Sequence, residues 1–145
     1  MKPDKASILI KRGALECEKT AAPILAEYDI TFSQFKVLKF LYHNTECSVR
    51  LMDLEKCFSL THPSAIGIVK NLEKKELVTR VSDEEHPRIR YIILTEKGEA
   101  LRENLISAGD LIEDKLTSGL TAEERKQLIH LLSKMQKIDI QEDLT

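Results

Sequence analysis

The pattern of residues changes in the middle of the chain, and this change limits the possible folds more than any other feature of the sequence. A short helical segment that begins at Ser48 is followed by a second one that begins at Thr61, and both residue types are favoured at helix N-termini. Two segments rich in β-branched residues come next, 77–81 and 90–94, separated by the polar stretch 82–89 as in a hairpin with a long tip. A helix-turn-helix followed by a β-hairpin is a winged helix. The sequence therefore predicts a mainly α fold with a small β-hairpin wing.

Helices are predicted on the N-terminal side of this segment. Residues 6–28 carry apolar residues at helical spacing, and Pro23 should kink this helix because proline removes a backbone hydrogen bond. Thr31 and Gln34 have the spacing of a capping box, which predicts a helix over 32–43.

Two more helices are predicted on the C-terminal side. Thr95 opens a helix whose apolar residues follow a 3.6-residue period until Gly119, and Thr121 with Glu124 forms a second capping box at the start of the last helix. The apolar stripes of the terminal helices have no partner nearby in the sequence. We therefore expect one helical region built from 1–30 and 96–145, and a winged helix-turn-helix domain over 31–95.

The charge of the chain is small and unevenly distributed. The 145 residues carry a formal net charge of −2, from 22 Lys and Arg against 24 Asp and Glu, which argues against binding nucleic acid by bulk charge alone. Residues 1–30 hold five basic and five acidic residues, 31–95 hold ten and eight, and 96–145 hold seven and eleven. The middle segment is therefore the basic part.

Several classes of protein are not predicted. The first apolar run, 8–10, is far shorter than a signal-peptide core, and no stretch approaches the roughly 20 residues that a bilayer span needs, so we expect a cytoplasmic protein with no membrane partner. The sequence contains no GxGxxG, GxSxG, P-loop or HExxH motif, so we predict neither an enzyme nor a cofactor.

The cysteines do not indicate a disulfide framework or a metal site. Cys17, Cys47 and Cys57 are an odd number without CxxC spacing, and we expect reduced, buried thiols. His43 with Cys47 and Cys57 with His62 have helical-looking spacings, and zinc binding is the alternative interpretation of these pairs. Because both pairs span predicted helix ends and turns, we expect no metal.

Four fragments, in matching order and spacing, resemble the multiple antibiotic resistance regulator (MarR) family of bacterial transcription factors. Residues 31–38 are similar to the family's LTxxQFxVL segment and 71–78 to its RLExKGLV segment; 94–98 resemble LTEKG, and 119–125 resemble GLTxEER. The resemblance covers essentially the full chain. It implies an obligate homodimer in which the first helix and the last two helices of each subunit form a helical dimerisation region, while the winged helices contact DNA. Family members commonly sense small aromatic or anionic compounds.

The helix that begins at Thr61 is the candidate recognition helix, because the second helix of a helix-turn-helix lies in the major groove. Its predicted inward stripe consists of Ala65, Ile68, Val69 and Leu72. The candidate DNA contacts are the residues left on or near the other face: Thr61, His62, Ser64, Gly67, Lys70, Asn71 and Lys74. The alternative interpretations are a plain N-cap for Thr61 and a solvated helix face for His62 and the lysines.

Two positions of this helix depart from the family pattern. Gly67 stands where family members often carry arginine, so this residue cannot make a bidentate guanine contact. Glycine inside a helix costs about 1 kcal/mol relative to alanine, so Gly67 indicates either close approach of the backbone to DNA or a weak binder. Glu76 replaces a glycine at the helix end, and we expect the turn before the first strand to close without its usual left-handed residue.

The wing also departs from the family pattern. The family usually has Asp, any residue and Arg at 86–88, so the resemblance implies that Arg88 enters the minor groove without its orienting carboxylate. His86 and Arg90 are further candidate contacts. The three acids at 83–85 would repel phosphates unless they pair with arginines of the hairpin. The wing therefore holds Arg88 with a different acid, contacts DNA weakly, or is simply a flexible exposed loop.

The resemblance also implies an effector cleft. Its candidate lining residues are Tyr28, Phe32, Phe35 and Tyr42, and an ordinary core role is the alternative for each of them. The peroxide-sensing subgroup of the family uses an N-terminal cysteine, but Cys17 lies 14 residues before the capping box, closer than that subgroup implies. Burial as a small hydrophobic residue is the favoured interpretation of the thiols, and a redox switch is the alternative.

The sequence thus predicts a MarR-type regulator of transcription that binds double-stranded DNA. The expected form is a homodimer on a pseudo-palindromic operator with half-sites about 10 base pairs apart, modulated by a small-molecule effector. The alternative is a winged-helix dimer that has lost specific DNA binding and acts as a protein-interaction or ligand-binding module. Gly67, the acidic wing tip and the net charge favour this alternative.

Overall fold

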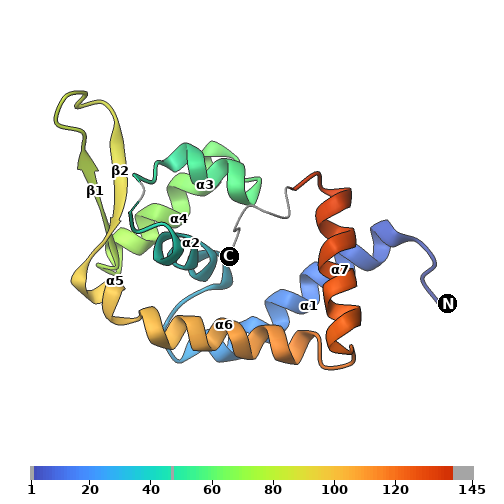
Figure 1. Cartoon of the computed structure of the whole chain (residues 1–145). Coiled ribbons are helices and arrows are strands. Elements are labelled where there is room, and N and C mark those ends of the chain that lie inside the picture. The colour runs from blue at the N-terminus through green and yellow to red at the C-terminus, as the bar shows by residue number, and fades with distance from the viewer. Residues whose placement is uncertain (1, 47, 139–145) are drawn as a thin grey trace. The chain divides into compact units, whose positions relative to one another are not determined.

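The computed structural model describes residues 2–46 and 48–138. Within them, helices and strands follow one another in the order that Figure 1 shows: α1 (Ala6–Ala26), α2 (Phe32–His43), α3 (Leu51–Phe58), α4 (His62–Lys74), β1 (Val78–Ser82), β2 (Arg90–Leu94), α5 (Glu96–Ala100), α6 (Arg102–Leu116) and α7 (Ala122–Met135). The predicted fold class, mainly α with a small β-hairpin in a winged helix-turn-helix, is confirmed.

The chain divides into two compact units. Unit 1 is formed by the residues up to Asp29 and from Ser107 onward, and unit 2 by Ile30–Ile106. Unit 2 therefore contains α2 to α5, the hairpin and the first residues of α6. Unit 1 contains α1, the rest of α6 and α7.

The helix starts of unit 2 follow from side-chain caps. Helix α2 has the predicted bounds, because Thr31 Oγ1 accepts from Gln34 N at 3.1 Å while Gln34 Oε1 accepts from Thr31 N at 3.2 Å. Thr61 caps α4 and Thr95 caps α5 in the same way, each accepting from the backbone N–H three residues later. These interactions are local, which is why the sequence predicted them.

Helix α3 begins at Leu51, so the predicted start at Ser48 was wrong. The carboxylate of Asp53 accepts from the backbone N–H of Arg50 at 2.8 Å and fixes the helix start there. Val49 is buried, and its carbonyl accepts from Ile92 N of β2 at 2.8 Å. A hydrogen bond to a strand more than 40 residues away in sequence thus holds 48–50 out of the helix.

The helix predicted from Thr95 to Gly119 is interrupted. Helix α5 ends at Ala100, and the N–H of Leu101 donates to the carbonyl of Gly98, three residues earlier, at 3.3 Å. Helix α6 then runs from Arg102 to Leu116. Helix α1 continues past Pro23 to Ala26.

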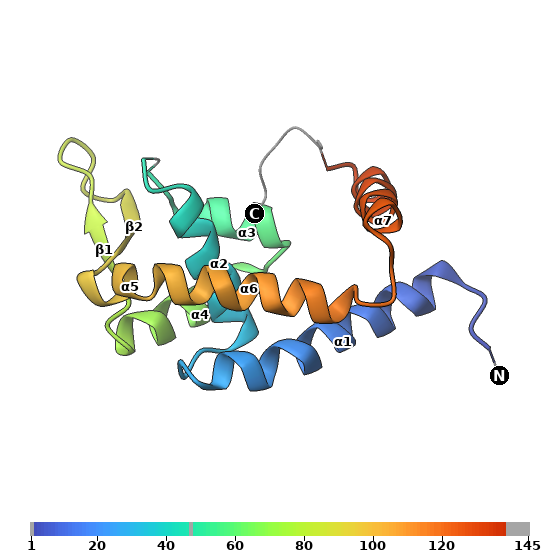
Figure 2. The ribbon, with the colours of Figure 1, turned by 60° about the horizontal axis from the view of Figure 1, so that its bottom comes forward.

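The core of unit 2 joins the helix-turn-helix to the hairpin. Leu38 of α2, Leu54 of α3 and Leu72 of α4 are fully buried, and Ile92 of β2 is 4% exposed. The two strands are antiparallel, with Val78 opposite Leu94 and Ser82 opposite Arg90. The strand predicted at 77–81 begins one residue later than expected, because Leu77 N donates to Leu72 O in the preceding turn. In both views the tip of the hairpin projects beyond α3 and α4 (Figures 1 and 2).

The turn between α4 and β1 closes through a left-handed residue after all. Glu76 has φ +62°, so the expectation that this turn lacks a left-handed residue was wrong. The N–H of Leu77 donates to Leu72 O at 3.0 Å and that of Glu76 to Glu73 O at 2.9 Å, as in a Schellman motif. Thr95 Oγ1 donates to the carbonyl of Glu76 at 2.6 Å. These bonds outweigh the cost of about 1–2 kcal/mol for a left-handed residue with a side chain.

Gly98 allows α5 to lie directly against this turn. A Cβ at Gly98 would lie 2.1 Å from the carbonyl oxygen of Leu77 and 3.3 Å from a methyl group of Leu94. No side chain fits in that space. The glycine therefore fixes where α5 begins on unit 2, which is the physical reason for a glycine three residues after Thr95.

Unit 1 is built differently. Its described buried hydrophobic residues are Ala21, Leu25, Ala108 and Ile112. Large hydrophobic side chains on α1, α6, α7 and the loop between the last two are exposed: Ile8, Leu9, Ile10, Leu15, Leu111, Leu116, Leu120, Leu128, Ile129, Leu131 and Met135. The predicted capping box of α7 is present, with Thr121 Oγ1 accepting from Glu124 N at 3.1 Å.

Candidate nucleic-acid interface

The recognition helix α4 is anchored along one face and exposed along the other. Ala65, Val69 and Leu72 are buried and Ile68 is half-buried, as the inward stripe predicted. The seven candidate contact residues are all exposed: Thr61, His62, Ser64, Gly67, Lys70, Asn71 and Lys74. The helix therefore presents a continuous polar face to a ligand.

The N-terminus of α4 is held in place by its own side chains and by α3. Thr61 Oγ1 accepts from Ser64 N at 3.3 Å and donates to Ser64 Oγ at 2.9 Å. His62 Nδ1 lies 3.4 Å from Glu55 Oε2 of α3. Thr61 is thus an N-cap in this structure. Its hydroxyl also remains exposed, so the N-cap interpretation and a DNA contact are compatible.

The tip of the wing is organised by Asp83. Its carboxylate accepts from the backbone N–H groups of Glu85 and His86 at 2.9 and 3.0 Å and from the hydroxyl of Tyr91 at 2.7 Å. These hydrogen bonds, the one from Tyr91 above all, lower the pKa of Asp83. One of the three acids before the tip is therefore used to shape the loop.

The wing arginines are not occupied by those acids. Arg88 and Arg90 are exposed, and in the part of the chain that the structure describes neither forms an ion pair. Arg80 is paired instead with Glu73 of α4, Nη2 to Oε1 at 2.8 Å, which ties the hairpin to the recognition helix. The idea that a different acid of the wing holds Arg88 is not supported.

A groove of about 530 Å³ lies between the wing, the start of α3 and the start of α4, all within unit 2. Four arginines and one histidine line it, against one carboxylate: Arg50, Arg80, Arg88, Arg90, His62 and Glu55, with Leu51, Met52, Ile89 and Ile92 as apolar walls. Arginine is the side chain best suited to phosphate, because its planar fork donates two parallel hydrogen bonds.

Arg50 and Arg80 were missed as site residues from the sequence, whereas Arg88 and Arg90 were among the candidates. Arg80 and Arg90 lie on the same face of the hairpin, because Arg80 pairs with Ile92 and Arg90 with Ser82 in the strand register. The two-residue alternation of a strand could have shown this once the register was known. Arg50 was missed because it was assigned to the inside of a helix, whereas it directly precedes α3.

Arg80 has an unused donor. Its side chain is 24% exposed, and its Nε–H is buried without a hydrogen-bond acceptor among the described residues. Buried polar groups are normally hydrogen-bonded, so such a group calls for an explanation.

The aromatic residues predicted to line an effector cleft pack as ordinary core residues do. Phe35 and Tyr42 are buried and Tyr28 and Phe32 half-buried, and the rings of Phe32 and Phe35 stack with centroids 6.2 Å apart. Their packing fits the core interpretation.

Among the described residues, no three or more His, Cys, Asp or Glu side chains are grouped so that they could hold a metal ion. Within the same residues, no helix is long and apolar enough to cross a membrane.

The cysteines are only partly buried. Cys17 and Cys57 are both half-buried, and burial raises the pKa of the Cys57 thiol, opposed by the nearby ammonium of Lys36. Cys47, and with it the His43–Cys47 pair, lies outside the described residues, as does the tail from Asp139.

Comparisons with known proteins agree with this geometry. Residues 28–89 match the model of the MarR family. The chain is 32% identical over 117 residues to the HTH-type transcriptional regulator FarR of Neisseria gonorrhoeae, covering 81% of this chain and 79% of that protein. The structure of the S. aureus MepR–DNA complex is similar with a TM-score of 0.84 and 31% identity, covering 93% of this chain and 98% of that one. The structure of Bordetella bronchiseptica BpsR is similar in fold, with a TM-score of 0.84 and 24% identity, over 94% of this chain and 96% of that one.

Proposed function

The chain belongs to the MarR family of DNA-binding transcriptional regulators, and from this premise we propose that it acts as a homodimer whose two copies of unit 2 bind the half-sites of a pseudo-palindromic operator. Such half-sites lie about 10 base pairs apart. Like its relatives, the protein regulates transcription and is not an enzyme. The observation that carries the proposal is the arginine-lined groove between the wing and the recognition helix.

The groove and the exposed face of α4 would make different kinds of contact with DNA. Phosphate contacts fix the register of a protein on DNA, and base contacts specify the sequence. Arg50, Arg80 and Arg90 line the groove and would contact the phosphate backbone. Arg88, nearer the tip, would reach the minor groove. The exposed residues from Thr61 to Lys74 would face the major groove.

This arrangement explains how a chain with a negative net charge would bind DNA. The negative net charge belongs to the whole chain, whereas the groove is lined by four arginines and the single carboxylate of Glu55. Among the described residues, only Arg80 of the four is paired with an acid outside the groove, Glu73. Affinity therefore comes from a few placed side chains in each unit 2 and from having two copies of that unit, since linking two binding modules can raise affinity by about 10²–10⁴.

The exposed apolar residues of unit 1 support the homodimer. A monomeric protein rarely exposes large contiguous apolar patches, and such patches mark interaction sites. Eleven large hydrophobic residues are exposed among the described residues of unit 1, and a second copy of the chain would cover them. A twofold arrangement of the DNA-binding units then follows.

A small-molecule effector is the remaining part of the proposal. The DNA binding of BpsR is regulated by 6-hydroxynicotinic acid. By analogy, we expect a small molecule to change the affinity of this protein for its operator by shifting the population of dimers that can bind DNA.

Selection of duplexes from a random pool, followed by titration at several salt concentrations, tests the proposal. We expect a discrete pseudo-palindromic site and a linear fall of log affinity with log salt, because arginines release counterions from phosphates. Failure to enrich any sequence, with no preference at low salt, would contradict the proposal. It would favour instead a dimer that has lost specific DNA binding.

Arg88→Ala tests the role of the wing in that complex. We expect affinity for the selected operator to fall about tenfold and the salt slope to become shallower, because the variant removes one positive charge from the DNA interface and fewer counterions are then released on binding. Lys126→Ala removes an exposed positive charge from α7 and should change neither quantity. If Arg88→Ala also leaves both unchanged, the wing does not contact DNA.

A further inference from the structure

The break between α5 and α6 lies in unit 2, shortly before the chain passes into unit 1 at Ser107. Helix α5 is fixed on unit 2 by the close contact of Gly98 with Leu77. After the single residue Leu101, helix α6 begins with Arg102 and continues into unit 1. The direction of α6 relative to unit 2 therefore depends on what holds its first turn, where Leu105 is fully buried and Arg102 is hydrogen-bonded.

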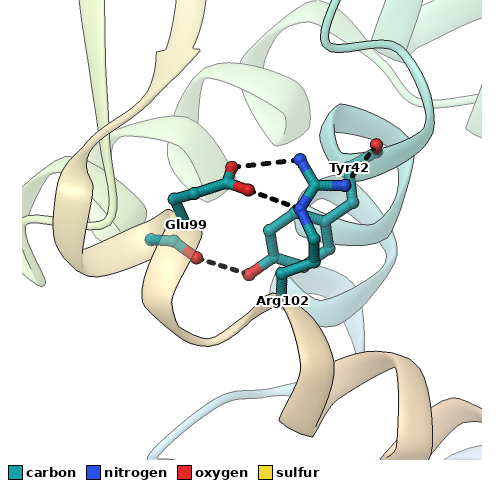
Figure 3. Close-up of polar contacts among 4 residues, drawn as sticks. Tyr42, Glu99 and Arg102 are labelled. Atoms are coloured by element: carbon teal, nitrogen blue, oxygen red, sulfur yellow. Dashed lines mark hydrogen bonds and ion pairs between the residues drawn. The ribbon is translucent and has the colours of Figure 1, made fainter.

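Side chains from three elements meet at this break, as Figure 3 shows. The hydroxyl of Tyr42, near the end of α2, donates to the carbonyl of Gly98 at 2.7 Å, and this bond is buried. Arg102 Nη1 donates to the backbone carbonyl of Tyr42 at 2.8 Å. The Nε and Nη2 groups of the same guanidinium donate to the two carboxylate oxygens of Glu99.

One guanidinium thus connects α2, α5 and α6. The carbonyl of Tyr42 belongs to the last turn of α2, where carbonyls lack partners within the helix and a positive charge is favoured by the helix dipole. The guanidinium carbon of Arg102 also lies 5.0 Å from the centre of the Tyr42 ring. The hydrogen bond from Arg102 keeps the pKa of Glu99 below its usual value. Lysine could not reproduce this set of contacts, because it lacks the planar fork.

We propose that Arg102, held by Glu99 and Tyr42, is a positioning residue that sets the direction of α6 as it leaves unit 2 and thereby the half-site spacing that the dimer accepts. This inference rests on the proposed function. Helix α6 has 15 residues and is therefore about 22 Å long, so a change of about 10° at its start moves its far end by about 4 Å. That displacement is comparable to the rise of one base pair, about 3.4 Å.

The contacts of Arg102 with Tyr42 contribute more to positioning α6 than its ion pair with Glu99 does. Solvent-exposed ion pairs contribute about 0.2–1 kcal/mol to stability, and the Glu99 and Arg102 side chains are 50% and 29% exposed. The loss of Arg102 is therefore expected to have little effect on the folding of unit 2. Its specific effect is on the geometry of the joint.

The test compares Arg102→Ala with Arg125→Ala in the full-length protein. Arg125 forms an ion pair of similar kind with Glu113, Nε to Oε1 at 3.0 Å, but both residues lie in unit 1, away from this joint. Affinities are measured for the selected operator and for versions with one base pair inserted or removed between the half-sites. The ratio of these affinities is the readout. A loss of folded protein lowers all affinities equally and leaves the ratio unchanged.

We expect the wild type to prefer one spacing, Arg125→Ala to retain that preference, and Arg102→Ala to reduce it by about fivefold or more, the size of a modest coupling between sites. Glu99→Gln, which keeps the shape but removes the charge, should give a smaller change in the same direction. An Arg102→Ala protein with the wild-type ratio would overturn this inference alone. A wild-type protein that selects no duplex would instead overturn the proposed function.

Discussion

The two units of this protein solve the problem of burying apolar surface in different ways. Unit 2 has 15 buried hydrophobic residues and three large exposed ones, Met52, Val81 and Ile93, among the described residues. Unit 1 has four buried hydrophobic residues and eleven large exposed ones in its described part. Unit 2 therefore has a core of its own, whereas unit 1 exposes most of its large apolar side chains, which a second copy of the chain would cover in the dimer that we propose. Two parts of one chain can thus differ in whether their apolar side chains form a core within the part or lie exposed on its surface.

The largest expected effect comes from making the exposed surface of unit 1 polar. The double variant Leu128→Asp/Leu131→Asp replaces two exposed leucines of α7 with aspartates. Exposed charges should not disturb the fold of a monomer, but unpaired charges buried in an interface should prevent dimerisation. We expect a monomer in sedimentation and a loss of DNA affinity of at least about 100-fold, because bivalency is lost. Ile93→Asp, at an equally exposed apolar residue of unit 2, should remain dimeric. A double variant that stays dimeric would place the interface elsewhere.

Gly98→Ala tests the packing within unit 2. The added Cβ would lie 2.1 Å from a backbone carbonyl, so α5 must move away from the turn that follows α4. We expect the free energy of unfolding of unit 2 to fall by about 3 kcal/mol, measured by amide hydrogen exchange in α2 and α4. A Cβ at Gly119 would meet nothing within 4 Å, so Gly119→Ala is the control and should change stability much less. Equal effects of the two substitutions would contradict the close contact.

Alkaline pH tests the core of unit 2 through Tyr42. Burial raises the pKa of Tyr42 from 10.0 to about 12, with the Glu99 charge adding to the effect and Arg102 opposing it. As pH rises from about 10 to 12, the unfolded chain loses this proton before the folded one does. The free energy of unfolding should therefore fall over that range, by about 2 kcal/mol. Denaturant titrations of the wild type and of Tyr42→Phe should differ in this pH dependence, because the variant lacks the hydroxyl that titrates.

The smallest expected effect is that of Gly67→Ala. A Cβ at Gly67 would meet nothing within 4 Å, so no contact within the protein requires glycine there. We expect α4 to gain about 1 kcal/mol of stability from the higher helix propensity of alanine. The DNA affinity of the variant then distinguishes the two interpretations of Gly67, close approach of the backbone to DNA or a weak binder. A marked loss of affinity would indicate that the backbone approaches DNA closely, and no loss would indicate a weakened recognition helix. A destabilised variant would contradict the open surroundings of Gly67.

The features that could be predicted from the sequence are those with local causes. The capping boxes at Thr31 and Thr121, the N-cap at Thr61 and the buried stripe of α4 each depend on residues within one or two helical turns. The exposed face of α4 followed from the same periodicity. For these elements, side chain and backbone partner are neighbours in sequence, so the pattern of residues is sufficient to indicate the structure.

The features that sequence analysis missed depend on contacts between distant segments. Residues 48–50 were predicted to be helical, but the hydrogen bond from Ile92 N to Val49 O holds them out of the helix. Glu76 adopts a left-handed conformation because neighbouring backbone bonds and Thr95 outweigh its cost. Arg50 and Arg80 become part of one groove only when the hairpin folds beside the start of α3. None of these partners can be identified from local periodicity.

The sequence by itself determined the change from helices to a hairpin in the middle of the chain, the helix caps and the resemblance to a family of regulators. These follow from short-range preferences of the backbone and from motifs that are contiguous in sequence. Only the tertiary structure decided that four arginines line one groove, that α5 and α6 are separate helices joined at Leu101, and that Arg102 connects three elements there. Such arrangements depend on long-range packing, which places side chains together regardless of their distance along the chain.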